Sequence, residues 1–91
     1  MATYILLKES EDNQIIEVHG LNSADTRSLT HNCGITNNAS AGILRFNSKE
    51  MSALTIPKIL NETSRLGYQV VCSMSHHHEK IWTLVKHKHN Q

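Results

Sequence analysis

Three consecutive histidines and a carboxylate, His76-His77-His78-Glu79, are the residues of this chain whose types are best suited to chemistry. Neutral imidazoles bind zinc, nickel and copper well. A structural zinc site needs a set of converging ligands, usually four, whereas neighbouring side chains on a strand diverge. Of this segment, His76, His78 and Glu79 could converge. The pattern therefore leaves two hypotheses open: a small metal-binding module and a solvated hairpin loop over residues 75–80.

Pairs of residues elsewhere in the chain do not suggest catalysis. A nucleophile needs a neighbouring base and a group that orients that base. Cys33 follows His31 too closely in sequence for the two to converge without a sharp turn. His19 has Glu17 as its evident carboxylate partner. From these residues we expect a protein that is not an enzyme and has no cofactor.

Length and composition limit the classes of protein further. The 91 residues fit one domain, residues 1–91, with a core thin enough that self-association would help it. Nine Lys and Arg against eight Asp and Glu give a formal charge of +1, which predicts no nucleic-acid partner. No signal peptide and no long apolar run are visible, so we expect no membrane partner and a cytoplasmic protein, with the nucleus as a second compartment. Cys72, within an apolar strand pattern, is predicted to be a buried, reduced thiol.

The elements that must position these residues follow from hydrophobic spacing and from helix and turn signals. Strands are expected over residues 3–7, 15–18, 43–47, 68–74 and 81–85, a short helix over about 23–31 and the main helix from Pro57 to Leu66. Residues 37–42 are expected to form a polar loop. Because strands occur in pairs, the order predicts an α+β fold with a small, mostly antiparallel sheet, one main helix and one short helix.

Both expected helices carry start and stop signals. Pro57 suits the first turn of the main helix, and Gly67 suits the left-handed residue after it. The apolar face of that helix is expected to contain Ile56, Ile59, Leu60, Thr63 and Leu66. Ser23 or Asp25 is expected to cap the short helix, with Gly34 as its stop.

In the C-terminal third of the chain, the expected main helix ends in the turn Arg65-Leu66-Gly67-Tyr68. A strand ending in Ser73-Met74 follows, then a short loop and a strand with a single tryptophan, Trp82. This segment resembles the GTP cyclohydrolase I feedback regulatory protein family, in which a helix ends in an Arg-x-Gly-aromatic turn and is followed by a strand ending in Ser-Met, a short loop and a strand with a single tryptophan. The N-terminal Tyr4-Ile5-Leu6-Leu7 agrees more weakly. The chain departs from the family at the histidines, where the family has a small glycine-containing loop, and over residues 35–52.

The resemblance implies a non-catalytic regulatory subunit that binds GTP cyclohydrolase I and assembles into a toroidal homopentamer. It implies feedback inhibition by tetrahydrobiopterin and stimulation by phenylalanine, which act as effector ligands of the complex. The implied partner and effector interface contains Met74, Ser75, His76, His77, His78, Glu79, Lys80, Ile81 and Trp82. The histidines in this loop affect the expected effector response more than the expected fold. Trp82 is expected to be either a core or interface anchor or a surface on which a ligand stacks.

Overall fold

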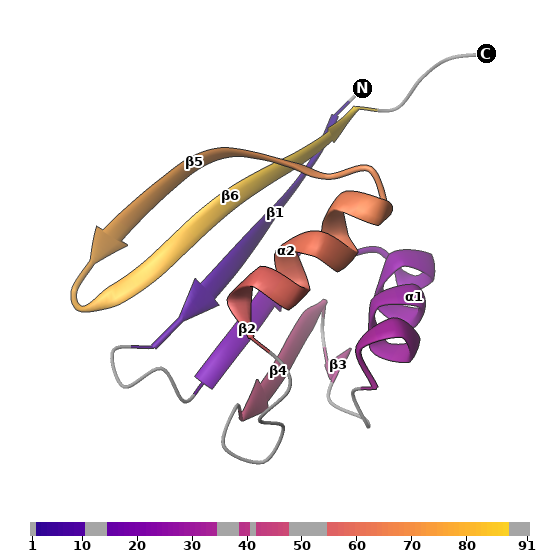
Figure 1. Cartoon of the computed structure of the whole chain (residues 1–91), viewed down its shortest axis with the longest axis horizontal. Helices are drawn as coiled ribbons and strands as arrows, with labels where there is room; N and C mark the ends of the chain where they lie inside the picture. Colours follow the sequence, from indigo (N-terminus) through magenta and orange to yellow (C-terminus); the bar gives the residue numbers. More distant parts are fainter. Residues whose placement is uncertain (1, 11–14, 35–38, 41, 48–54, 88–91) are drawn as a thin grey trace.

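The computed structural model of the chain describes residues 2–10, 15–34, 39–40, 42–47 and 55–87. Within these residues the chain forms six strands and two helices, which confirms the predicted α+β fold. In chain order the elements are β1 (Ala2–Glu9), β2 (Ile15–His19), α1 (Ser23–Cys33), β3 (Ala39–Ser40), β4 (Ile43–Asn47), α2 (Ile56–Arg65), β5 (Gln69–His76) and β6 (Glu79–His87) (Figure 1).

All described strands belong to one antiparallel sheet in the order β3-β4-β2-β1-β6-β5. Hairpins β1–β2 and β5–β6 are neighbours in this sheet because β1 pairs with β6 over its full length, from Ala2 opposite His87 to Glu9 opposite Lys80. The N-terminal strand therefore lies inside the sheet, and the C-terminal hairpin forms one side of it. The predicted pairing of strands 68–74 and 81–85 is confirmed.

The core lies between one face of the sheet and the two helices, which pack beside each other on that face (Figure 1). Alternate strand residues point into it, as a period of two requires. The buried apolar residues in strands β1, β2, β4 and β6 that make up this layer include Ile5, Leu7, Ile16, Val18, Leu44, Phe46 and Leu84. Leu29 of α1 and Ile59 of α2 cover them.

Helix α2 presents the apolar face that its sequence predicts. Ile59 and Thr63 are buried, while Ile56, Leu60 and Leu66 are partly buried against the core. The helix begins at Ile56, one residue earlier than predicted, because the Thr55 hydroxyl accepts a hydrogen bond of 3.4 Å from the Lys58 N–H. Gly67 follows the helix with φ of 99°, as predicted for a left-handed stop.

The predicted cap of helix α1 was wrong. Asn22, and neither Ser23 nor Asp25, is the cap, because its side-chain oxygen accepts a 2.8 Å hydrogen bond from the Asp25 N–H. The Asp25 side chain is buried instead. Gly34 ends α1 with φ of 68°, as predicted.

Two predicted loops are shorter than the sequence suggested. Ala39–Ser40, expected within a polar loop, form β3 and pair with β4; residues 37, 38 and 41 of that loop lie outside the described residues. The predicted loop over 75–80 was wrong, because Ser75 pairs with Lys80 and His76 pairs with Glu79. The backbone hydrogen bonds between β5 and β6 continue as far as His76 and Glu79, because buried or paired strand backbone groups need partners. Only His77 and His78 are left in the turn.

Candidate functional site

The β5–β6 hairpin extends past the end of helix α2, so part of it has no helix on either face (Figure 1). Every residue of β5 is exposed. Strand β5 is also the last strand of the sheet, with β6 on one side and no further strand on the other among the described residues. This hairpin is therefore the part of the described chain that is most open to a partner.

The tip of the hairpin is a tight turn built from two histidines. His77 and His78 have φ of 48° and 67°, the left-handed values that a two-residue hairpin turn requires at both positions. Asn-Gly is the usual sequence there, although histidine is one of the residue types enriched among left-handed residues. The ring centres of His76 and His77 are 4.0 Å apart, and the two rings are in an edge-to-face arrangement. The turn thus presents a compact group of imidazoles at the end of the molecule.

The histidine segment does not bring together the ligands that the metal hypothesis needs. His76 and Glu79 lie opposite each other on β5 and β6, whereas His78 belongs to the turn. Over the part of the chain that the structure describes, no group of three or more His, Cys, Asp or Glu side chains is arranged to hold a metal ion. The donors His76, His78 and Glu79 therefore do not form a three-ligand site within one chain.

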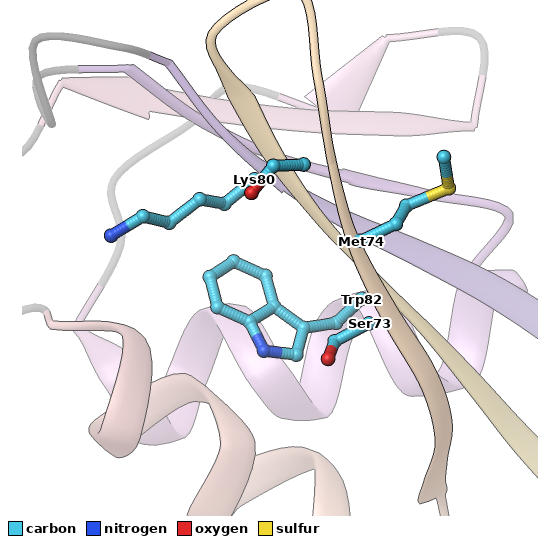
Figure 2. A pocket seen from close by; sticks show the side chains of 5 residues that line it. Ser73, Met74, Lys80 and Trp82 are labelled. Carbon is cyan, nitrogen blue, oxygen red and sulfur yellow. The ribbon is translucent and has the colours of Figure 1, made fainter.

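A hollow of about 340 Å³ lies beside the tryptophan of β6. Its lining comes from both strands of the hairpin: Ser73, Met74, Ser75, Lys80 and Trp82. Figure 2 shows the Lys80 side chain extending alongside the indole ring, with Ser73 next to that ring and Met74 pointing away from it. An apolar ring, an ammonium group and hydroxyl groups thus share one recess. Such a recess suits a small ligand with a planar apolar part and an anionic part.

Trp82 takes part in both of the roles that the sequence left open. Its ring is partly buried against the core cluster, and it also lines the hollow. A second hollow, also of about 340 Å³, surrounds the turn and is lined by residues 75–80. The predicted interface residues Met74 to Trp82 are thereby all on this hairpin, and most of them line one of the two hollows.

The predicted interface is nevertheless divided between the two faces of the hairpin. Because side chains alternate along a strand, Ser75 and Lys80 share the face of Trp82, as the cross-strand pairing shows. Met74 and Ile81 are paired on the opposite face, as are His76 and Glu79. A partner that contacts all of these residues must therefore grip the hairpin from both faces or along its edge.

The two cysteines have different surroundings. Cys72 is exposed, so its predicted burial was wrong: it lies on the last strand of the sheet and on the face opposite the helices. Cys33 is partly buried, and burial together with the nearby Glu62 carboxylate raises the pKa of its thiol. Glu62 lies 3.6 Å from the Lys58 ammonium, and its Oε1 has no hydrogen-bond partner among the described residues.

A partly buried polar cluster, which the sequence did not reveal, lies where the hairpin meets helix α1. The Tyr68 hydroxyl donates a 2.7 Å hydrogen bond to Asp25 Oδ2, and the Lys86 ammonium lies 3.1 Å from the same oxygen. Lys86 Nζ is also 5.3 Å from the centre of the Tyr68 ring. These groups satisfy one another, and they tie α1 to β6 and to the residue just before β5. Their separation in sequence left no local pattern to detect.

Burial, the hydrogen bond to Asp25 and the charge of Asp25 together raise the pKa of Tyr68 above its ordinary value. The phenol therefore stays protonated and continues to donate to the carboxylate. This cluster is a structural clamp at the base of the hairpin.

His19 and Glu17, which the sequence indicated as possible partners, are paired on the sheet face opposite the helices. His19 Nε2 lies 2.8 Å from Glu17 Oε1, and Arg45 Nε lies 3.5 Å from Glu17 Oε2. Each of these residues is at least partly exposed. The group is a surface ion-pair network between β2 and β4, of a kind that contributes little to stability.

Comparison with known proteins identifies the fold. No protein-family model matches the chain, and no curated protein matches it in sequence. The chain is similar to the crystal structure of a conserved kinetoplastid-specific protein from Trypanosoma cruzi, with a TM-score of 0.58 and 11% sequence identity. The match covers 96% of this chain and 99% of that one, so the likeness extends over nearly the whole α+β fold. Neither described helix is long and apolar enough to cross a membrane.

Proposed function

We propose that this chain is a non-catalytic regulatory subunit that binds GTP cyclohydrolase I through its β5–β6 hairpin. The partner comes from the sequence resemblance, which also supplies the effectors: inhibition through tetrahydrobiopterin and stimulation through phenylalanine. The observation that carries the proposal is the hollow beside Trp82. It lies within the segment that the resemblance assigns to the partner and the effector.

The lining of this hollow suits an amino acid with an aromatic side chain. The aromatic ring of the ligand would pack against the Trp82 indole, and its carboxylate would lie near the Lys80 ammonium. The hydroxyls of Ser73 and Ser75 add hydrogen-bonding groups. The hollow is open on the isolated chain, and small-molecule sites usually enclose most of their ligand. A partner surface that closes it would therefore increase the affinity for the ligand.

Coupling between effector and enzyme follows from that geometry. If the ligand is enclosed only when the subunit sits on the enzyme, each of the two binding events strengthens the other. The subunit then changes the kinetics of the enzyme by preferring one of its conformational states. As the resemblance implies, the docking unit would be a toroidal homopentamer acting in the compartment of its enzyme.

The tip of the hairpin adds a dependence on pH. His76, His77 and His78 are exposed, as is Lys80, and Glu79 is partly exposed. Histidine is the side chain whose charge ordinarily changes between about pH 5 and 8. We therefore expect the affinity for the enzyme to differ between acidic and neutral solution.

The test is to titrate the chain into GTP cyclohydrolase I from the same source, with and without each effector, at about pH 6 and pH 8. Enzyme kinetics and complex formation are both measured. The variant Lys80→Gln should weaken the response to phenylalanine while the chain stays folded, because it removes the charge that faces the ligand carboxylate. Arg27→Gln, at an exposed position on α1, is the matched control and should respond like the wild type. Unchanged kinetics and no complex under all conditions would contradict the proposal.

A further inference from the structure

Strand β5 lacks most of the devices that usually protect the edge of a sheet. Natural edge strands are shortened, charged, interrupted by proline, bulged or covered. Of these, β5 has one irregularity, a shift in its pairing with β6 between Val70 and Cys72. The opposite edge follows this rule, since β3 has two residues. In contrast, β5 has eight residues, QVVCSMSH, without proline and without Lys, Arg, Asp or Glu. Each of β1, β2, β4 and β6 carries at least one of those charged residues.

The side chains of β5 are also unusually apolar for an exposed strand. Val70 is 47% exposed, Val71 is 55% exposed and Met74 is 52% exposed. Figure 1 shows β5 at the outer margin of the molecule, with no helix beyond it. An edge of this kind offers both a row of backbone hydrogen-bonding groups and apolar contacts to an added strand.

We infer that β5 pairs antiparallel with β5 of a second copy of this chain, about a two-fold axis near the middle of the strand. Such a contact uses the same surface twice and closes at two copies. Self-pairing matches two edges of equal length, and it brings no charged side chain of one β5 against another, so like-charge repulsion is absent. A charged segment of another protein would find no opposite charge along this strand. The absence of charge therefore favours a second copy as the occupant.

The contact is small, since it involves one strand from each copy. Cross-strand neighbours for Val71 and Met74 and the added backbone hydrogen bonds would stabilise it. Interfaces at the lower end of the size range, below about 1,200 Å², are typical of reversible association. The dimer should therefore depend on concentration.

This inference goes beyond the proposed function and does not rest on it. A ring requires contacts between two different surfaces, whereas the β5 contact joins identical ones. Chains in a ring could still pair through β5, and this would double the mass of the ring. In either case, removal of the β5 contact should halve the mass.

The experiment measures mass by sedimentation in reducing buffer, at chain concentrations from about 1 to 100 µM, the range over which a small interface assembles. Cys72→Lys places a lysine at the centre of β5, where the two-fold axis brings the two copies of it together, and should halve the mass. Cys72→Ser changes the same exposed side chain without adding charge and should keep the mass of the wild type. Asn61→Lys, at an exposed position on α2, adds the same charge elsewhere and should also keep it.

Circular dichroism shows whether each variant is folded. If Cys72→Lys does not fold, Val71→Lys gives a second test of the same contact. Wild-type mass that is halved by lysine on β5, and retained by both controls, supports the inference. A wild-type monomer over the whole range, or an assembly whose mass lysine does not change, overturns it. Either of these results leaves regulation of the enzyme to be judged by its own titration.

Discussion

Strands β1, β2 and β4 form the half of the sheet that the helices cover, and the β5–β6 hairpin contains similar apolar residues that are largely exposed. Val18 and Leu44 of the covered half are almost fully buried, whereas Val70, Val71 and Met74 of the hairpin are about half exposed. One cause is position, because β5 is the last strand of the sheet and Met74 lies on the face opposite the helices. A second cause is length. Helix α2, with 10 residues, is about 15 Å long, whereas the nine residues of β6 span about 30 Å. One helix cannot cover such a hairpin, so its far end is exposed on both faces.

This comparison assigns different physical roles to the two regions. The covered half contains most of the hydrophobic core, and the clamp of Asp25, Tyr68 and Lys86 joins it to the base of the hairpin. The hairpin contains the hollow beside Trp82 and an unprotected edge. Stability is therefore expected to be concentrated in the first region and recognition in the second. The following predictions test this division, beginning with the largest expected effect.

The sharpest test compares one buried residue with one exposed residue. Ile59→Ala should lower the free energy of unfolding by about 2–5 kcal/mol, because it leaves a cavity beneath α2. Met74→Ala, on the hairpin, should change it by no more than about 0.5 kcal/mol. Urea denaturation of both variants measures this, at a concentration below that of self-association. Similar losses for the two variants would show that the hairpin is part of the main stabilising core.

The clamp at the junction of the two regions should have an intermediate effect. Tyr68→Phe removes the hydrogen bond to Asp25 Oδ2 and should cost about 1–3 kcal/mol, since the carboxylate is buried. Thermal unfolding of the variant at neutral pH measures this loss.

The same clamp should make stability fall in alkaline solution. The pKa of Tyr68 is raised in the folded state from an ordinary value of 10.0. The stability linked to this group is therefore complete below about pH 10, and it is lost as the pH rises from there toward the folded-state pKa, because only the unfolded chain releases the proton. Between pH 9 and pH 11, the wild type should lose more stability than Tyr68→Phe. Parallel pH profiles for the two proteins would contradict the linkage.

The smallest effect is expected at the tip of the hairpin. Replacing His76, His77 and His78 with Ser should change the free energy of unfolding by no more than about 0.5 kcal/mol, because these side chains are exposed. His77→Asn combined with His78→Gly should instead stabilise by about 0.5–1 kcal/mol, since both positions have positive φ. Melting temperatures in metal-free buffer measure both changes. A large loss for the serine variant would show that the tip is structural.

Local patterns in the sequence determined most of the elements and the pairing of strands within a hairpin. The spacing of Ile56, Ile59, Leu60, Thr63 and Leu66 predicted the buried face of α2, and Gly34 and Gly67 marked the ends of both helices. Paired strands predicted the antiparallel α+β fold. These features depend on contacts within a few residues along the chain, and therefore the sequence carries their signal. The regulatory role, the partner and the ring are predictions from resemblance, and their tests are the titration and the measurement of mass.

The tertiary structure alone decided which apolar residues are covered. The sequence of β5 predicts a buried strand, yet Cys72 and Met74 are exposed because β5 is the last strand of the sheet and both residues lie on the face opposite the helices. It also decided that Asp25 meets Tyr68 and Lys86, from segments far apart in the chain. Strand order and the reach of a helix over a sheet are properties of the assembled layers. No local pattern of residues specifies them, so the clamp, the hollow and the open edge could be found only after the chain was folded.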